Sequence, residues 1–107
     1  MGRKVSHSGW ERNLLEKIDQ HIRLRRYRLS RHAMERLRAR SLELHDLVSI
    51  LRRGFHEESK SVFNIKMQTW NYAIRGKTLD GVDARVVIAF EKDMIIITAI
   101  RLTNRKK

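Results

Sequence analysis

Three side chains within residues 29–40 have the types and the spacing needed for phosphate chemistry. His32, Arg36 and Arg40 follow one another at intervals of four residues, so a helix would place them in a row along one flank. An imidazole exchanges a proton near neutral pH, and a guanidinium binds phosphate oxygens through two parallel hydrogen bonds. We therefore predict that His32 transfers a proton and that Arg36 and Arg40 clamp a phosphate. A solvated structural flank is the alternative, because the charge pattern alone does not distinguish a site from a surface.

A short helix that begins after Ser30 is predicted to carry this row. The Ser30 hydroxyl can accept a hydrogen bond from a free N–H group of the first helical turn. At 100° per residue, Ala33, Met34 and Leu37 then share one apolar face. The row of His32 and the two arginines lies beside that face, where it stays accessible.

Two further helices are predicted on either side of this one. Residues 8–11 fit a capping box, which predicts a helix from residue 8 to about residue 25 with its apolar positions on one stripe. Apolar residues at i, i+3, i+4 and i+7 predict another helix over residues 44–53, with Ser41 as N-cap and Gly54 directly after its end. Residues 27–29 are predicted to be a short connector.

After Gly54 the apolar period changes from about four residues to two, which is typical of strands. Alternating patterns cover residues 63–67, 70–74 and 82–90, and an isoleucine-rich run follows at 94–102. The stretch 55–59 fits either a short strand or a loop. We predict an α+β fold in which N-terminal helices pack on a sheet of three or four mainly antiparallel strands.

The net charge of +12, from 24 Lys and Arg against 12 Asp and Glu, predicts a polyanionic partner. Nucleic acid is the first choice, an acidic protein the second and an anionic membrane surface the third. Arg75, Arg85 and Arg101 occupy strand positions opposite the larger apolar set. For each of these three residues, a solvated sheet face is the simpler interpretation. The predicted nucleic-acid contacts are Arg25, Arg26, Arg28, Arg31, Arg75, Arg85 and Arg101.

Composition also narrows the kinds of site and the compartment. The chain has no Cys, which excludes disulfides and thiolate metal sites. Its five His show no metal-binding spacing and there is no Gly-rich phosphate loop, so we predict neither a metal nor a cofactor. No apolar run approaches the roughly 18 residues that span a membrane, and residues 1–9 lack the apolar segment of a secretory signal. We therefore expect a cytoplasmic protein without a membrane partner.

One pattern resembles the signature of a family of small bacterial domains of unknown function, and here it reads Ser30-x-His32-Ala33-x-x-Arg36-Leu37-x-x-Arg40. The resemblance covers residues 27–102, with Ser41 where the family often has Gly. It implies an α+β domain at 27–107 preceded by a basic tail and extra helix at 1–26. The family is similar to the RelE/barnase-like ribonucleases, which include toxins of toxin–antitoxin systems. The resemblance therefore implies a ribonuclease or RNA-binding role, and an acidic antitoxin as partner.

Two functions remain open for the His32 row. In the first, the protein is a toxin-like, metal-independent endoribonuclease in which the imidazole moves a proton and the arginines hold the scissile phosphate. In the second, it is a non-catalytic basic module that binds nucleic acid or an acidic protein. His32 is then structural, and Arg36 or Arg40 pairs with a carboxylate such as Asp46 or Glu57.

The sequence also gives expectations for Tyr72, His56 and the first predicted helix. Tyr72 is predicted to belong to the core rather than to the site, because buried aromatic residues keep only a polar tip in water. His56, next to two glutamates, is a second candidate for acid–base work. The helix predicted over residues 8–25 could dock on another chain, although packing on its own core is the expectation for an amphipathic helix.

Overall fold

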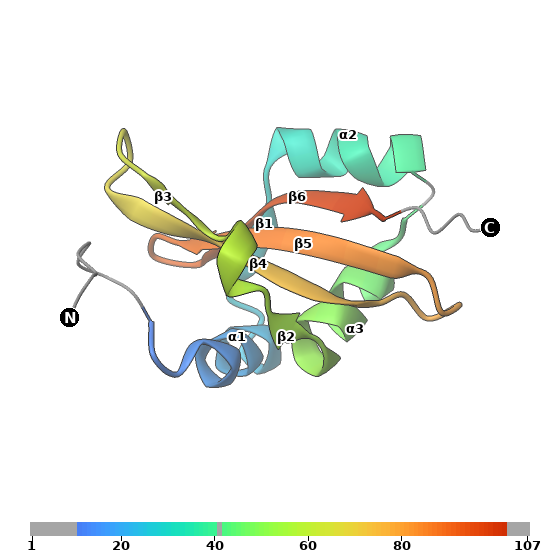
Figure 1. Cartoon of the computed structure of the whole chain (residues 1–107), viewed down its shortest axis with the longest axis horizontal. Helices are drawn as coiled ribbons and strands as arrows, with labels where there is room; N and C mark the ends of the chain where they lie inside the picture. Colours follow the sequence, from blue (N-terminus) through green and yellow to red (C-terminus); the bar gives the residue numbers. More distant parts are fainter. Residues whose placement is uncertain (1–10, 41, 103–107) are drawn as a thin grey trace.

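Three long antiparallel strands form the centre of the molecule, and three short strands extend them into a mixed sheet of six (Figure 1). The computed structural model describes residues 11–40 and 42–102. The sheet order is β1-β6-β5-β4-β2, and β3 pairs with β4 outside this path. The bounds are α1 Leu14–Arg23, β1 Tyr27–Leu29, α2 Arg31–Arg40, α3 Leu44–Arg53, β2 Phe55–His56, the 3₁₀ helix η1 Glu58–Lys60, β3 Val62–Asn64, β4 Thr69–Lys77, β5 Asp83–Phe90 and β6 Met94–Arg101.

The strand count is higher than the three or four predicted. The long strands β4, β5 and β6 are the predicted antiparallel meander, and their alternating residues mark one buried face. Strands β1, β2 and β3 have only two or three residues each, too few for a period of two to become visible in the sequence. The predicted connector at 27–29 is β1, which pairs in parallel with β6, whereas the other strand pairs are antiparallel.

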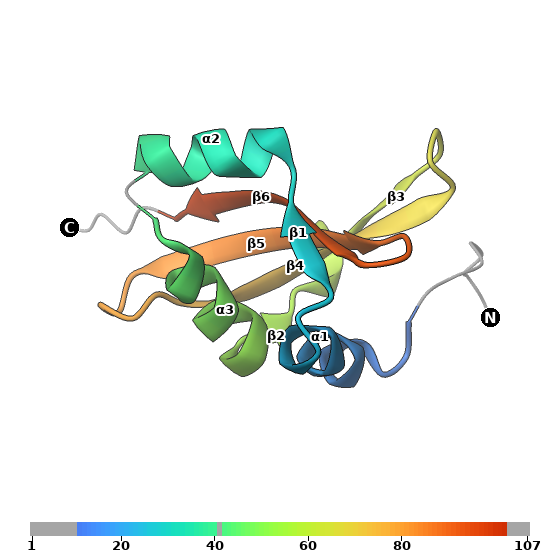
Figure 2. The same ribbon diagram turned by 180° about the vertical axis from the view of Figure 1, so that it is seen from behind.

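The α-helices build the core on one face of the sheet. Figure 2 shows α1, α3 and β1 in front of the long strands, with α2 beside β6 at the edge. The opposite face carries the alternate strand residues and is crossed by η1 over part of β4 (Figure 1). We call this second face the open face. The buried core consists of Leu14, Ile18, Ile22, Ala33, Leu42, Leu47, Ile50, Leu51, Tyr72, Ile74, Ala84, Val86, Ile88, Met94, Ile96 and Ala99.

A β-bulge between β5 and β6 decides which face Arg101 occupies. The register shifts at this point, so Ile97 has no directly opposite residue in β5. Beyond the shift, Arg101 lies opposite Ala84, which is fully buried on the helix-covered face. The expectation that Arg101 shares a face with Arg75 and Arg85 is therefore wrong. One extra residue reverses the side of every later position in a strand with a period of two.

Helix α1 begins at Leu14 rather than at residue 8, and the predicted N-cap at position 8 lies outside the described residues. Glu11 precedes the helix, and its backbone N–H donates to the Oη of Tyr72 at 2.9 Å. Leu14, Ile18 and Ile22 are buried in the chain's own core. These three residues of the apolar stripe therefore pack on the chain's own core, whereas Leu15 is 43 % exposed.

The ends of α2 and α3 show one confirmed and one wrong N-cap prediction. The backbone N–H of Ala33 donates to the Ser30 Oγ at 3.0 Å, so Ser30 caps α2 as predicted. The N-cap of α3 is Glu43, whose backbone N–H donates to the Asp46 Oδ2 at 3.1 Å. Ser41, the predicted N-cap, lies outside the described residues and is two positions before Glu43.

In the described part of the chain, no helix is long and apolar enough to cross a membrane.

Ser30 joins α2 to the bulge of β6, so replacing this serine tests how much the junction contributes to stability. Its Oγ donates to the Ile97 carbonyl at 2.8 Å while it accepts from Ala33. Ser30→Ala should lower the free energy of unfolding by about 1 kcal/mol, since a helix cap and a carbonyl partner are lost together. Ser59→Ala, at an exposed serine of η1, is the control and should change stability little. Equal urea unfolding midpoints for the two variants would contradict the proposed role of Ser30.

Candidate nucleic-acid interface

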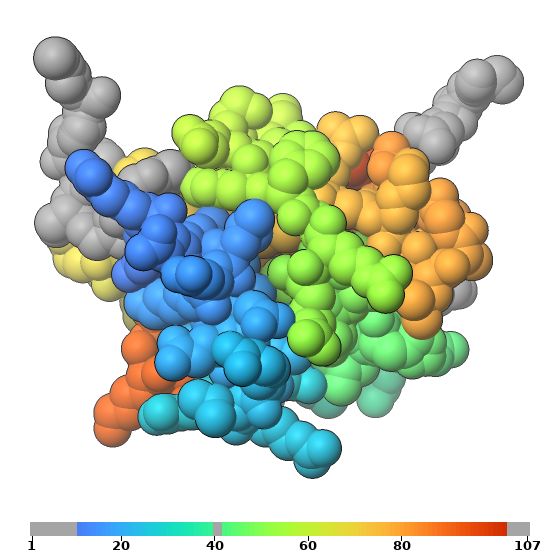
Figure 3. Space-filling view, turned by 90° about the horizontal axis from the view of Figure 1, so that it is seen from below, coloured from blue at the N-terminus to red at the C-terminus, as the bar shows by residue number. Residues whose placement is uncertain are grey.

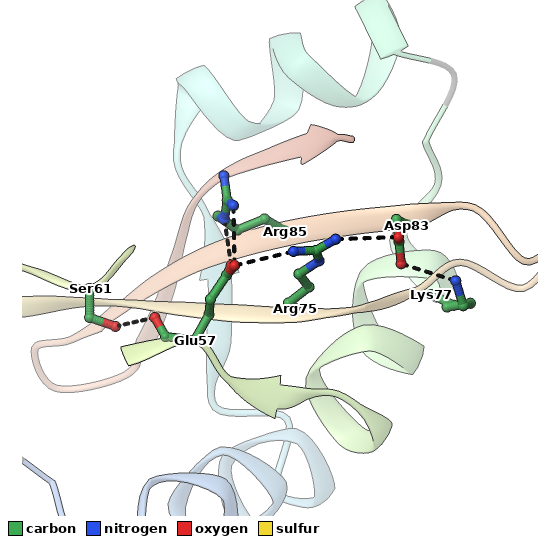
Figure 4. Close-up of polar contacts among 6 residues, drawn as sticks. All are labelled: Glu57, Ser61, Arg75, Lys77, Asp83 and Arg85. Atoms are coloured by element: carbon green, nitrogen blue, oxygen red, sulfur yellow. Dashed lines mark hydrogen bonds and ion pairs between the residues drawn. The ribbon is translucent and has the colours of Figure 1, made fainter. Parts of the chain in front are cut away.

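Five charged side chains form a network across the open face (Figure 4). Glu57, which follows β2, accepts hydrogen bonds from Arg85 Nε at 2.7 Å and Nη2 at 3.4 Å, and from Arg75 Nη1 at 3.4 Å. Asp83 accepts from Arg75 Nη2 at 3.4 Å and from Lys77 Nζ at 3.1 Å. The network thus links β4, β5 and the segment after β2.

Strand register explains why Glu57 is needed at the centre of this network. Arg75 and Arg85 lie directly opposite each other in the β4–β5 pair, and like charges at such positions repel. The Glu57 carboxylate bonds to both guanidiniums and offsets that repulsion. Its side chain is only 12 % exposed and that of Arg85 only 17 %, so solvent screens this ion pair less than an ordinary surface pair.

Both carboxylates of the network are held in their ionised form. The hydrogen bond from Arg85 lowers the pKa of Glu57 below its ordinary value of 4.5, and Arg75 acts in the same direction. The hydrogen bond from Lys77 lowers the pKa of Asp83, again with help from Arg75. At neutral pH the network therefore has three cations against two anions, and it stays attractive to a phosphate.

The predicted row on α2 is present as two side chains in contact, an exposed His32 and a half-buried Arg36. Arg36 Nε lies 3.5 Å from His32 Nε2, at the limit of a hydrogen bond. Ala33 between them points into the core, so the pair stands on the flank of the helix, as its spacing predicted. Arg40 is the last residue of α2, and its side chain lies outside the described part of the structure.

The orientation of α2 places this pair toward the open face. Met34, on the other flank of the helix, lines a surface hollow together with Leu44 of α3, on the side where α3 covers the sheet. His32 and Arg36 occupy the flank that faces away from α3. They therefore border the same side of the sheet as Glu57. The described hydrogen bonds do not link the two groups directly.

The remaining predicted arginines lie near the start of β1 and of α2. Arg25, Arg26, Arg28 and Arg31 are all exposed. Arg26 and Arg28 reach carboxylates of the β5–β6 turn at 3.8 Å and 3.5 Å, pairs that are screened by solvent and contribute little stability. The structure brings Arg75 and Arg85 together on the open face, keeps these four arginines on the β1 side, and puts Arg101 on the opposite face.

Sequence reasoning missed Glu57, Lys77 and Asp83 as members of a common network. Glu57 is one of the two carboxylates predicted to pair with Arg36 or Arg40, but it bonds to Arg85, 28 residues away in the chain. The other suggested partner, Asp46, caps α3 and accepts from the Leu79 N–H at 3.1 Å. The pairing of Arg36 with either carboxylate is therefore wrong. Only the alternation of Lys77 and Asp83 with core residues indicated that they face away from the helices.

His56, the second acid–base candidate, lies on the helix-covered side. It pairs in register with buried Ile74, its Nε2 lies 3.0 Å from Ser61 Oγ, and burial lowers its pKa. The ring packs edge-on against Tyr72, which is buried as predicted. These contacts fix the position of the His56 ring. Within residues 11–40 and 42–102, no three His, Asp or Glu side chains gather closely enough to hold a metal ion.

Comparison with known proteins adds one family match. The profile of a family described as a domain of unknown function (DUF4258) matches residues 29–101, which runs from the end of β1 to the end of β6. No curated protein and no solved structure matches the chain.

Proposed function

The chain belongs to the DUF4258 family, whose function is unknown, and we propose that it acts on RNA as a metal-independent endoribonuclease. One observation carries the proposal. The His32–Arg36 pair of α2 and the Arg75–Glu57–Arg85 network border the same open face of the sheet. One ligand on this face could therefore contact a proton-transfer group and several cations together. The net charge of +12 attracts a polyanion to them.

The reaction needs a base, an acid and cations that hold the phosphate. The 2′-oxygen of the RNA attacks the adjacent phosphorus, the bond from phosphorus to the 5′-oxygen breaks, and a 2′,3′-cyclic phosphate and a 5′-hydroxyl result. A base must take the 2′-hydroxyl proton, and an acid must protonate the leaving oxygen. We assign the first of these transfers to His32, which takes the 2′-hydroxyl proton, and solvent water protonates the leaving 5′-oxygen. Arg36 and Arg40 bind the non-bridging oxygens, whose negative charge grows in the transition state.

The other cations extend the surface along the RNA. Arg75 and Arg85 are positioned by Glu57, which keeps their guanidinium planes on the open face. Arg25, Arg26, Arg28 and Arg31 add exposed charge beside β1. The motif's resemblance to RelE/barnase-like ribonucleases supports the same activity by analogy alone, because a shared fold does not carry a function. Under that analogy, an acidic antitoxin protein would complement the positive charge.

A binding module without catalysis is the second candidate, and one observation favours it. A catalytic histidine is usually oriented through its second ring nitrogen by a carboxylate or a carbonyl. Among the described residues, His32 has Arg36 as its hydrogen-bond partner and neither of those groups. A surface of this composition would still bind RNA through salt-dependent phosphate contacts.

Cleavage of RNA in EDTA tests the proposal. The purified protein should produce fragments with 2′,3′-cyclic phosphate ends, and His32→Ala should slow cleavage about a hundredfold while RNA affinity stays nearly constant. His45→Ala is the matched control, because His45 is also an exposed helical histidine, paired with Glu43 at 3.3 Å. It should cleave like the parent.

The two candidate functions give different results in this assay. Intact RNA that is bound equally by the parent and by His32→Ala would exclude catalysis and leave the binding module. Cleavage that is unchanged in His32→Ala would reject the role of His32. A parent protein that neither binds nor cleaves RNA would overturn both functions.

A further inference from the structure

A surface hollow lies at the edge of the sheet, where the end of α3 meets the turn between β4 and β5. It is lined by Ser49 and Arg53 of α3, Phe55 of β2, residues 75–79 and Asp83. Figure 3 shows the molecule from below, with the green residues of α3 and β2 beside the orange residues of the β4–β5 turn. Arg75 belongs both to this hollow and to the network on the open face, so the two sites are continuous.

The hollow exposes an aromatic ring. Phe55 is 56 % exposed, and its neighbour across the hollow, Leu79, is 61 % exposed. Phe55 lies directly opposite Arg75 in the β2–β4 pair, so its ring is on the same side as the charged network. Exposed aromatic rings beside cations are the usual platforms on which single-stranded nucleic acids stack their bases.

The cations of the hollow outnumber its carboxylates. Asp83 pairs with Lys77 at 3.1 Å and with Arg75 at 3.4 Å, so one carboxylate faces three cations. Arg53 is exposed, and in the described structure no carboxylate lies within ion-pair distance of it. A phosphate that enters the hollow therefore meets a free guanidinium and a lysine whose ammonium has donors to spare.

The frame of the hollow is held in place before any ligand binds. Gly54, between Arg53 and Phe55, packs so closely on β4 that a Cβ atom would lie 2.4 Å from the Arg75 carbonyl oxygen. The facing turn is tied to α3 because the Leu79 N–H donates to Asp46 Oδ1 at 3.1 Å. A site positioned in this way loses little conformational freedom on binding.

We propose that this hollow binds one unpaired nucleotide of single-stranded RNA, with the base stacked on Phe55 and the phosphate held by Arg53 and Lys77. The inference rests on the proposed RNA-acting function and assigns it a subsite outside the His32–Arg36 row. It predicts that RNA must present an unpaired base at a fixed distance from the site of cleavage. Duplex RNA, whose bases are stacked internally, would not use this subsite.

Binding of a fluorescein-labelled oligouridine by fluorescence anisotropy tests the subsite. Phe55→Ala should weaken binding about tenfold, the loss expected for one base stack, and Phe55→Trp should restore it. Ile65→Ala, at a 74 % exposed residue of the β3–β4 turn, is the control and should bind like the parent. Arg53→Gln should reduce the slope of log affinity against log salt by about 0.7, which is one phosphate contact on a single strand.

The outcomes separate this inference from the proposed function. If the parent binds oligouridine and Phe55→Ala binds equally well, the subsite is wrong while the RNA-acting function stands. An equal loss of affinity for a duplex of the same length would also overturn base stacking, since the effect would then be non-specific. A parent protein that binds neither RNA would overturn the subsite and the proposed function together.

Discussion

Gly54→Ala should lower the free energy of unfolding by about 3 kcal/mol, although the backbone angles of Gly54 suit any residue. A Cβ atom at this position would lie 2.4 Å from the Arg75 carbonyl oxygen and 2.6 Å from that of Ile50. Both obstacles are backbone atoms, so neither can move aside as a flexible side chain would. The end of α3 must shift away from β4, which opens the packing of buried Ile50.

Gly81→Ala is the control for this prediction because Gly81 is needed for a different reason. Its φ of +84° is in the left-handed region, while a Cβ atom there would meet nothing within 4 Å. The strain of that angle should cost about 1 kcal/mol. Urea unfolding of the two variants measures both losses. A Gly54→Ala loss no greater than that of Gly81→Ala would contradict the role assigned to the close approach.

Glu57→Gln should lower the free energy of unfolding by about 2 to 3 kcal/mol at pH 7. The substitution keeps the shape of the side chain but leaves Arg75 and Arg85, directly opposite each other in the sheet, without their shared carboxylate. The loss is smaller than for a fully buried pair because the Arg75 side chain is 36 % exposed and partly screened. Chemical denaturation at pH 7 measures it.

The pH dependence of stability provides a second readout for Glu57. Its pKa in the folded protein lies below the ordinary value of 4.5, chiefly because Arg85 donates a hydrogen bond to it. The unfolded chain therefore takes up the proton first as the pH falls. The stabilisation by Glu57 is complete above pH 4.5 and is lost as the pH falls through the lower folded pKa. The difference between parent and Glu57→Gln should shrink over that acidic range.

Glu58→Gln is the matched control, because Glu58 is the next residue and is exposed on η1. It should change stability by less than about 0.5 kcal/mol and leave the acid limb of the parent unchanged. Asp83 also has a lowered pKa, so part of the acid dependence should persist in Glu57→Gln. A Glu57→Gln variant as stable as Glu58→Gln at pH 7 would show that the network contributes no stability.

Local sequence patterns predicted the features that neighbouring residues control. Ser30 caps α2 as expected, because an N-cap depends on a side chain and an N–H group three residues apart. The bounds of α3 follow from apolar spacing, and Gly54 ends the helix as predicted. The reason why this position needs a glycine was not predicted. The reason is that β4 packs closely against Gly54, and β4 begins 15 residues later in the chain.

The amino-acid sequence by itself determined the basic charge, the helical row of His32 and Arg36, the α+β class and the alternation of the long strands. Only the tertiary structure decided which distant charges meet. Glu57 bonds to Arg75 and Arg85 across 18 and 28 residues, and one bulge in β6 moves Arg101 to the other face. Helix caps and periods are set by contacts between near neighbours. Register and ion-pair partners depend instead on how whole strands pair, because that pairing buries the core.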